Sequence, residues 1–285
     1  MECVVAVDVG GTFMKGGLIR DGTVLHAERR PTPRAEGPAR VIAAISAFVA
    51  DLAVPRQGLR PTAVGLAVPG LVTPTHAVFS AAFGWRDVPA AAFTDVPLPV
   101  ALGHDVRSAG EAELAYGAAR DERDVLFLPI GTGIAGAMVL SAGLYGGAAG
   151  WAGQIGHVPV RPGGLPCGCG QSGCLSAYAS AASIAARCGE RSAAAVVARD
   201  DPLARQVWAE AVEALALALA TYTLLLDPAL IVIGGGLALS GEALLAPLRA
   251  RLAARLAFRP APRIALSSLG PHAGMLGAAL LATRA

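Results

Sequence analysis

The sequence predicts an α/β protein built from two lobes. Its 285 residues are too many for one minimal core and suit one large or two modest domains. Because 54% of the residues are apolar and only 15% are charged, the chain can bury a sizeable core and extended disorder is not expected. Strand-like apolar runs alternate with segments of helical period, which is typical of α/β folds. Three glycine clusters each follow an apolar run, as expected at strand ends in such folds.

The first half of the chain begins with a β-hairpin and then alternates between helix and strand. Residues 3–20 contain two β-branched runs on either side of Gly10-Gly11-Thr12, the pattern of a hairpin with a glycine turn. A third strand is expected at residues 23–27. The segments expected to follow are a helix at 39–52, a strand at 63–68 that turns at Pro69-Gly70, a strand at 98–102 and a helix at 108–119.

The second half begins with another hairpin and then becomes mainly helical. A strand at 125–128 runs into Gly131-Thr132-Gly133, and this unit resembles residues 3–20 closely enough to indicate a weak internal duplication. Residues 143–173 show no sustained period and are expected to form a loop region. The later predicted elements are helices at 176–187, 194–199 and 203–226, a strand at 230–233 that leads into Gly234-Gly235-Gly236, and a helix at 274–283.

The lobes are predicted at residues 1–118 and 119–273, with a zinc loop at 157–174 in the second. The final helix, within 274–285, could join the first lobe.

Composition and charge exclude several classes of partner. The formal net charge of +2 and the scattered arginines do not form the basic face that nucleic acids require, so no nucleic-acid partner is expected. Met1 leads directly into an apolar strand without a signal sequence, so we expect a cytoplasmic protein. The most apolar stretch, residues 214–226, is shorter than the roughly 20 residues that span a bilayer, so no membrane partner is expected either.

The glycine turns predict a nucleotide site. Asp8 precedes the Gly10-Gly11-Thr12 turn and Lys15 follows it. Glycines let main-chain N–H groups approach phosphates, threonine adds a hydroxyl donor, aspartate can hold Mg²⁺ through water, and lysine offsets phosphate charge. Gly131-Thr132-Gly133 has the same chemistry, and Gly234-Gly235-Gly236 suits the flat face of a base or sugar. Each cluster alone is more often a plain tight turn, and none matches a P-loop or a Rossmann turn.

Four residues predict a structural metal site. Cys167, Cys169 and Cys174 fall within eight residues, separated mainly by glycines, and His157 lies ten residues upstream of the first. Three thiolates and an imidazole form a closed tetrahedral set for Zn²⁺ with no open position for a reactive water. The alternative is a disulfide between neighbouring cysteines beside an unrelated histidine. An odd count of five cysteines argues against a disulfide framework.

These motifs together resemble the ROK family of bacterial sugar kinases over essentially the whole chain. The segments that carry the resemblance are Asp8-Val9-Gly10-Gly11-Thr12, Ala67-Val68-Pro69-Gly70, Gly103-His104-Asp105-Val106, Gly131-Thr132-Gly133-Ile134, Gly153-Gln154-Ile155-Gly156-His157, the cysteine segment ending in Leu175, and Leu226-Asp227-Pro228 through Gly236. The resemblance implies a two-lobed actin-like and hexokinase-like ATPase fold made of ribonuclease H-like repeats. It also implies ATP with Mg²⁺ as co-substrate, a structural Zn²⁺, and a dimer or tetramer.

The resemblance assigns the chemistry to Asp105, which would accept the proton of a sugar hydroxyl as it attacks the γ-phosphorus of ATP. From the residues alone, Asp105 could equally be a turn or helix-start aspartate. His157 would bind both zinc and sugar. The other positions implied to contact the sugar are Gly70, His104, Gln154 and Ser176.

Three of these positions depart from the family pattern, which restricts the choice of sugar. Many family members have asparagine where this chain has His104, and glutamate where it has Gln154 and Ser176. Glutamate accepts hydrogen bonds from sugar hydroxyls, while serine is too short to reach the same atom. We therefore expect a modified or N-acylated hexose, or glucose held weakly, rather than a cationic amino sugar. The alternative is a catalytically weakened regulatory protein that keeps nucleotide and zinc but has no DNA-binding module; a zinc hydrolase is disfavoured because the metal site is full.

Overall fold

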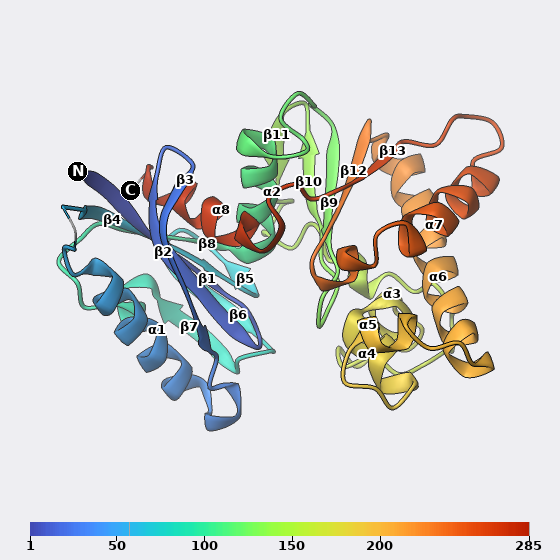
Figure 1. Cartoon of the computed structure of the whole chain (residues 1–285), viewed down its shortest axis with the longest axis horizontal. Coiled ribbons are helices and arrows are strands. Elements are labelled where there is room, and N and C mark those ends of the chain that lie inside the picture. The colour runs from blue at the N-terminus through green and yellow to red at the C-terminus, as the bar shows by residue number, and fades with distance from the viewer. Residues whose placement is uncertain (57, 285) are drawn as a thin grey trace. The chain divides into compact units, whose positions relative to one another are not determined.

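The computed structural model describes residues 1–56 and 58–284 and divides them into two compact units (Figure 1). The first unit consists of residues 1–117, 148–151 and 271–285. The second unit consists of residues 118–147 and 152–270. Each unit has its own hydrophobic core, so each can be described by itself.

The first unit is built on a five-stranded sheet in the order β3-β2-β1-β4-β8. Its strands are β1 (Glu2–Val9), β2 (Phe13–Arg20), β3 (Thr23–Pro31), β4 (Arg60–Val68) and β8 (Val100–His104). The β1–β2 and β2–β3 pairs are antiparallel, and β1, β4 and β8 run parallel. The hairpin predicted at residues 3–20 is therefore confirmed, with Gly10-Gly11-Thr12 as its turn.

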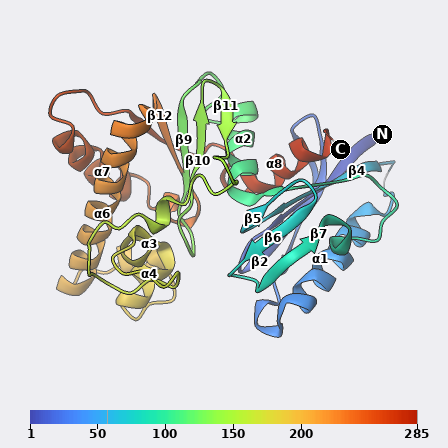
Figure 2. The same cartoon turned by 180° about the vertical axis from the view of Figure 1, so that it is seen from behind.

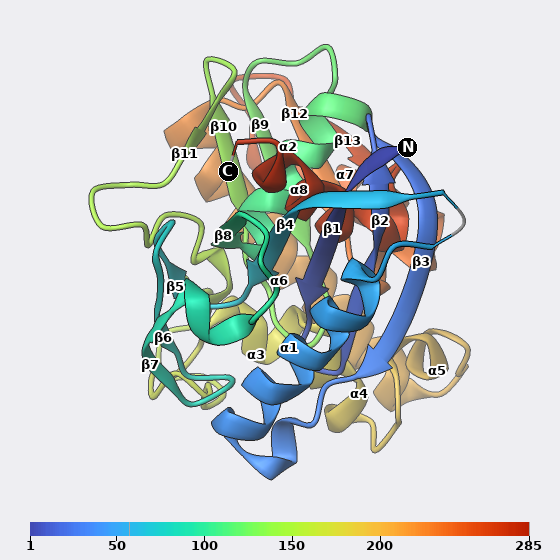
Figure 3. The same ribbon diagram turned by 90° about the vertical axis from the view of Figure 1, so that its left-hand side faces the viewer.

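Small residues let helices approach both faces of this sheet. Gly16 and Gly17 are neighbours in β2, so a Cβ added at each would point to opposite faces of the sheet, as side chains of successive strand residues do. A Cβ at Gly16 would lie 2.8 Å from Phe48 and Leu52 of α1 (Pro38–Ala53), and one at Gly17 would lie 3.0 Å from the sulfur of Met275 in α8 (Ala273–Ala282). Figure 3 shows α1 lying across the sheet. The other face carries α8, which also packs against α2 (Asp105–Tyr116).

Replacing Gly65 with alanine should destabilise the first unit. A Cβ at Gly65 in β4 would lie 1.8 Å from the main-chain oxygen of Ala278 in α8, and a backbone atom cannot rotate away. Overpacking of this kind costs about 1 to 3 kcal/mol, and each kcal/mol lowers the midpoint of thermal unfolding by about 2 to 4 °C in chains of this size. Gly143→Ala is a matched control, since its Cβ would meet only Leu140 O at 3.6 Å. Equal melting temperatures for the two variants, measured by calorimetry, would contradict the packing argument.

A small three-stranded sheet, β5-β6-β7, is an addition that the sequence analysis missed. Its strands are β5 (Leu71–Val72), β6 (His76–Ser80) and β7 (Trp85–Pro89), visible from behind in Figure 2. Trp85 anchors this region, stacked on Phe83 at 4.6 Å and edge-on to Phe93 at 5.2 Å between ring centroids. Such aromatic pairs add to the free energy gained by burial.

The second unit repeats the topology of the first. Its sheet has the order β11-β10-β9-β12-β13, with antiparallel pairs first and parallel pairs last. The strands are β9 (Val125–Pro129), β10 (Ala137–Leu140), β11 (Gly143–Tyr145), β12 (Leu230–Gly234) and β13 (Arg263–Leu266). The β9–β10 hairpin holds the place that β1–β2 holds in the first unit, which supports the internal duplication inferred from the sequence.

Helices complete the core of the second unit. They are α3 (Leu175–Ala179), α4 (Ala181–Arg187), α5 (Ala193–Val197), α6 (Pro202–Leu226) and α7 (Glu242–Arg255). The single helix predicted at 176–187 is wrong, because Ser180 has extended backbone angles (φ −68°, ψ 148°) and begins α4 as its N-cap. Helix α7 was not predicted.

Helix α6 is the single helix among the described residues that is long and apolar enough to cross a membrane by length and composition alone. Half of its apolar window is buried, and its buried side chains belong to the core of the second unit. Asp201 begins the helix by accepting hydrogen bonds from the N–H groups of Leu203 and Ala204 at 3.1 Å. The predicted stop is confirmed, since Asp227 ends the helix in a left-handed conformation.

Candidate active site

The first glycine turn connects β1 to β2 and is held by Thr32, the residue that follows β3. Gly10 N–H donates to Phe13 O at 3.1 Å across the turn. The Thr32 hydroxyl donates to Gly10 O at 2.8 Å, and Thr32 N–H donates to Thr12 O at 3.0 Å. A Cβ at Gly11 would meet nothing closer than the Arg34 guanidinium at 3.8 Å, so the main chain at Gly11 is open to a ligand.

Asp8 and Lys15 flank this turn from paired positions on β1 and β2. Lys15 Nζ lies 3.9 Å from Asp8 Oδ2. Burial raises the pKa of Asp8 to about 6, against the opposing effect of Lys15, and the charge of Asp105 adds to the increase. Because a side chain at Gly274 would lie 2.3 Å from Asp8 Oδ2, the first turn of α8 must have glycine here for the carboxylate to fit.

Asp105 lies where β8 ends and α2 begins. Its Oδ1 accepts a hydrogen bond from Val106 N–H at 2.7 Å, and its side chain is 24% exposed. The preceding residue, His104, is the N-cap of α2 and accepts from Arg107 N–H through Nδ1 at 3.3 Å. The helix therefore starts three residues before the predicted position, and this places Asp105 in its first turn.

Burial is the largest cause of the pKa shifts of Asp105 and His104. It raises the pKa of Asp105 to about 6, while the Val106 N–H and the charge of Arg107 act in the opposite direction. Burial also lowers the pKa of His104 to about 3, with a further lowering from Arg107. His104 is therefore neutral near pH 7, and because Nδ1 accepts a hydrogen bond, its proton must be on Nε2.

Gly70 connects β4 to β5 in a conformation that favours glycine, with φ at +118°. A Cβ there would lie 2.2 Å from Phe79 O. Packing within the first unit therefore accounts for glycine at this position.

In the second unit, two glycine clusters that are far apart in sequence lie side by side. Gly131-Thr132-Gly133 follows β9, and Gly234-Gly235-Gly236 follows β12. Ile130 joins them, since its N–H donates to Gly234 O at 2.9 Å and its carbonyl accepts from Leu237 N–H at 3.0 Å. Gly235 has φ +75°, and a Cβ there would lie 2.5 Å from Ile130 O.

The cysteine loop folds back on itself through main-chain hydrogen bonds. Val160 N–H donates to Gly173 O at 2.8 Å, Gly173 N–H donates to Leu165 O at 2.8 Å, and Leu175 N–H donates to Val158 O at 2.9 Å. These bonds bring His157, before the loop, to the cysteines at its end.

The four predicted zinc ligands meet in this loop. The ligand atoms of His157, Cys167, Cys169 and Cys174 all lie within 4.8 Å of one another. Cys167 Sγ is 3.7 Å from His157 Nδ1, and Cys169 Sγ is 3.7 Å from Cys174 Sγ. A tetrahedral Zn²⁺ with Zn–S bonds of about 2.3 Å separates its sulfur ligands by about 3.8 Å. All five cysteines are free thiols, so the three cysteines of this cluster are available as metal ligands.

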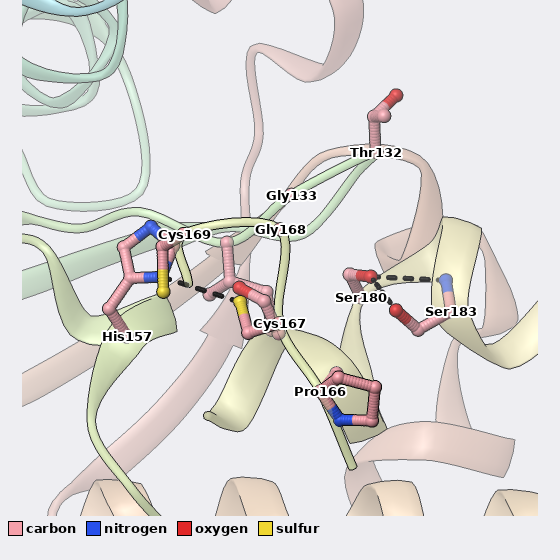
Figure 4. Close-up of a pocket in the computed structure, with 12 residues that line it drawn as sticks. Thr132, Gly133, His157, Pro166, Cys167, Gly168, Cys169, Ser180 and Ser183 are labelled. Carbon is pink, nitrogen blue, oxygen red and sulfur yellow. Dashed lines mark hydrogen bonds between the residues drawn. The ribbon is translucent and has the colours of Figure 1, made fainter. Parts of the chain in front are cut away.

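A cavity of about 290 Å³ lies beside this cluster within the second unit (Figure 4). Its walls include the Thr132-Gly133 turn, His157, the cysteine loop and Ser176. Two further lining residues, Ser180 and Ser183, were missed by the sequence analysis; their hydroxyls are 2.9 Å apart. The only sequence signal for them is a serine three residues before another at the start of a helix. Gln154 precedes the short 3₁₀ helix Ile155–His157 and is not among the lining residues.

Comparison with known proteins identifies the family. The chain is 31% identical to the glucokinase of Thermotoga maritima over 309 residues, covering 97% of this chain and 96% of the relative. It is 32% identical to the N-acetylmannosamine kinase of Escherichia fergusonii over 288 residues, covering 98% of this chain and 97% of the relative. Among solved structures, a ROK family glucokinase from Streptomyces griseus in complex with glucose and AMPPNP matches with a TM-score of 0.87 and 29% identity, covering 99% of this chain and 100% of that chain. The profile of the ROK family matches residues 4–285, and this chain belongs to that family.

Proposed function

We propose that this protein transfers the γ-phosphoryl group of ATP to the 6-hydroxyl of a hexose or modified hexose, with Asp105 as the base. The protein is an ATP-dependent sugar kinase: its relatives include glucokinases and N-acetylmannosamine kinases, and one structural relative holds glucose and AMPPNP. The observation that supports the finer assignment is the position of Asp105 at the end of β8, with a pKa raised to about 6. At neutral pH this carboxylate is ionised yet basic enough to take a proton.

Asp105 would act by orienting a hydroxyl and removing its proton as the new P–O bond forms. Phosphoryl transfer needs little covalent chemistry from the protein and depends on positioning and on charge neutralisation. One Asp105 oxygen, Oδ1, is engaged by Val106 N–H. The other oxygen, Oδ2, is the one we assign to the substrate hydroxyl.

The glycine turns are proposed to bind the nucleotide. On the first unit, main-chain N–H groups of the Gly10–Thr12 turn would face phosphate oxygens, Lys15 would offset their charge, and Asp8 would hold Mg²⁺ through water. The proposed contacts on the second unit are Gly131, Thr132, Gly133, Gly234, Gly235 and Gly236. When bound, Mg²⁺ would neutralise charge on the β- and γ-phosphates.

A structural zinc is proposed at His157, Cys167, Cys169 and Cys174. The separations between their ligand atoms, all within 4.8 Å, support a closed tetrahedral site. Zinc there would stabilise a loop that has few apolar side chains of its own. With zinc on one ring nitrogen, His157 would present its other ring nitrogen to the sugar.

The sugar is proposed to be a neutral hexose with an N-acyl or similar substituent, or glucose bound weakly. On the first unit its proposed contacts are Gly70, His104 and Asp105; on the second unit they are Gln154, His157 and Ser176. The short Ser176 side chain borders the 290 Å³ cavity, which leaves space where a longer carboxylate side chain would reach. The absence of carboxylates at 154 and 176 disfavours a cationic amino sugar, because each charged hydrogen bond contributes about 1.5 to 3 kcal/mol.

A phosphorylation assay tests this function. Purified protein with Mg-ATP would be given glucose, mannose, N-acetylglucosamine, N-acetylmannosamine and glucosamine in turn, and products would be identified by ³¹P NMR. We expect the largest kcat/KM with an N-acylated hexose and the product phosphorylated at carbon 6. Glucose turnover with an ordinary KM would refute the substrate assignment. Nucleotide and sugar binding without turnover would favour the regulatory alternative.

A further inference from the structure

Arg107 is a charged residue in an unfavourable place. It lies in the first turn of α2, where the helix dipole disfavours a positive charge. Burial lowers its pKa, and the charge of Asp105 opposes that effect. Its hydrogen-bond acceptors are main-chain carbonyl oxygens. Among the described residues no carboxylate forms an ion pair with Arg107, so these carbonyl contacts are what hold the guanidinium in place.

The guanidinium connects two segments that are distant in sequence. Nη1 donates to Gly150 O at 2.8 Å, and Nη2 makes a longer contact to Val72 O at 3.5 Å. Gly150 belongs to residues 148–151, the short stretch that joins the first unit although its neighbours on both sides belong to the second. Val72 ends β5. The planar fork of arginine can reach both carbonyls at once, which a lysine ammonium cannot do with the same geometry.

The same charge acts on Asp105 two residues away. Arg107 lowers the pKa of Asp105, against the raising effect of burial. The other ionisable groups around Asp105 are His104, which is neutral, with Nδ1 3.4 Å from Asp105 Oδ1, and Asp8, whose carboxylate is paired with Lys15. Among the described residues, Arg107 is therefore the cation whose charge lowers the pKa of Asp105.

We propose that Arg107 is a positioning residue that ties residues 148–151 to β5 from the same helix turn that carries Asp105. The tie acts through two carbonyl oxygens, and the charge of Arg107 acts on Asp105 in addition. This inference rests on the proposed function, because a role near Asp105 affects catalysis only if Asp105 is the base of the kinase. Its two physical effects can be measured without sugar or ATP.

Two substitutions separate the tie from the charge. Arg107→Lys keeps the charge and loses the fork, while Arg107→Gln loses the charge. Arg284→Gln is the control, because Arg284 pairs with Glu111 on the same helix, away from the base. The rate of limited chymotryptic cleavage after Trp151, which is 48% exposed and belongs to residues 148–151, reports the tie, and a ¹³C NMR titration of the Asp105 carboxyl reports the charge.

Both Arg107 variants should be cleaved after Trp151 faster than the wild type, by roughly tenfold or more, as expected for a lost charged hydrogen bond. Only Arg107→Gln should raise the pKa of Asp105, by about one unit. In the kinase assay, the acid limb of kcat/KM for Arg107→Gln should move to higher pH by the same amount, which a purely structural residue would not cause.

A cleavage rate after Trp151 equal to that of the Arg284→Gln control in both variants would show that Arg107 does not hold residues 148–151. An unchanged Asp105 titration in Arg107→Gln would overturn the electrostatic part. If the wild-type protein phosphorylated no sugar, the proposed function would fail, yet the cleavage and titration results would still decide the role of Arg107.

Discussion

Asp105→Asn should lower kcat for sugar phosphorylation by about 10² to 10⁴, the usual contribution of a positioned base. Asparagine has nearly the same shape, and its side-chain oxygen can still accept the hydrogen bond from Val106 N–H that holds Asp105. Asparagine has an NH₂ group in place of the second carboxylate oxygen, so it cannot accept the proton of the substrate hydroxyl. Steady-state kinetics at saturating ATP would measure kcat, and isothermal titration of AMPPNP would show that nucleotide binding is retained.

The pH dependence provides an independent check on this base. As the proposed base, Asp105 would act in its deprotonated form, and its pKa is raised to about 6, so kcat/KM should fall as the pH drops through about 6 and level off above it. Asp51→Asn is a suitable control, since Asp51 is 59% exposed and paired with Arg30. A variant at 105 with wild-type kcat, or a control that loses as much activity, would contradict the assignment of the base.

The parts of the fold that could be predicted are those fixed by residues close in sequence. The hairpins at Gly10-Gly11-Thr12 and after Val125 follow from glycine turns between apolar runs, and both are present. The end of α6 follows from Asp227-Pro228, because proline cannot continue a helix. In each case the deciding interaction lies within a few residues.

The sequence-based predictions of the fold are wrong or incomplete where contacts distant in sequence, or unusual N-cap residues, determine the local structure. Helix α2 begins at Asp105 because His104 serves as its N-cap, a role that sequence rules assign to Ser, Thr, Asp or Asn. The β5–β7 sheet is stabilised by Trp85 packing between Phe83 and Phe93, residues that form no periodic pattern. Such features depend on tertiary packing, and local propensity does not reveal them.

The candidate site shows the same division. The clustering of the four proposed zinc ligands could be predicted because three of them are packed into one short glycine-rich segment, and the structure brings all four together. The places of Ser180 and Ser183 in the cavity, and the contacts of Arg107, could not be predicted. Their roles depend on segments that approach only in the folded chain, such as residues 148–151.

Cys174→Ser should abolish zinc binding and cause the largest loss of stability among these variants. Cys174 is fully buried where the loop returns to α3, and a serine hydroxyl is a poor replacement for a thiolate on Zn²⁺. Loss of a structural metal belongs to the class of changes that cost about 4 kcal/mol or more, which corresponds to a decrease of roughly 10 °C in the melting temperature. Metal content measured by plasma emission, together with calorimetry, would test both statements.

Cys188→Ser is the matched control, because Cys188 is also a buried free thiol but lies outside the ligand cluster. It should keep its zinc and melt close to the wild type.

Chelation of the wild-type protein should reproduce the lower melting temperature of Cys174→Ser, and chelation of the Cys174→Ser variant should have no further effect. Wild-type protein purified without metal, yet melting at the same temperature before and after added zinc, would show that hydrogen bonds such as Val160 N–H to Gly173 O hold this loop unaided. The free thiols 3.7 Å apart would then require another explanation.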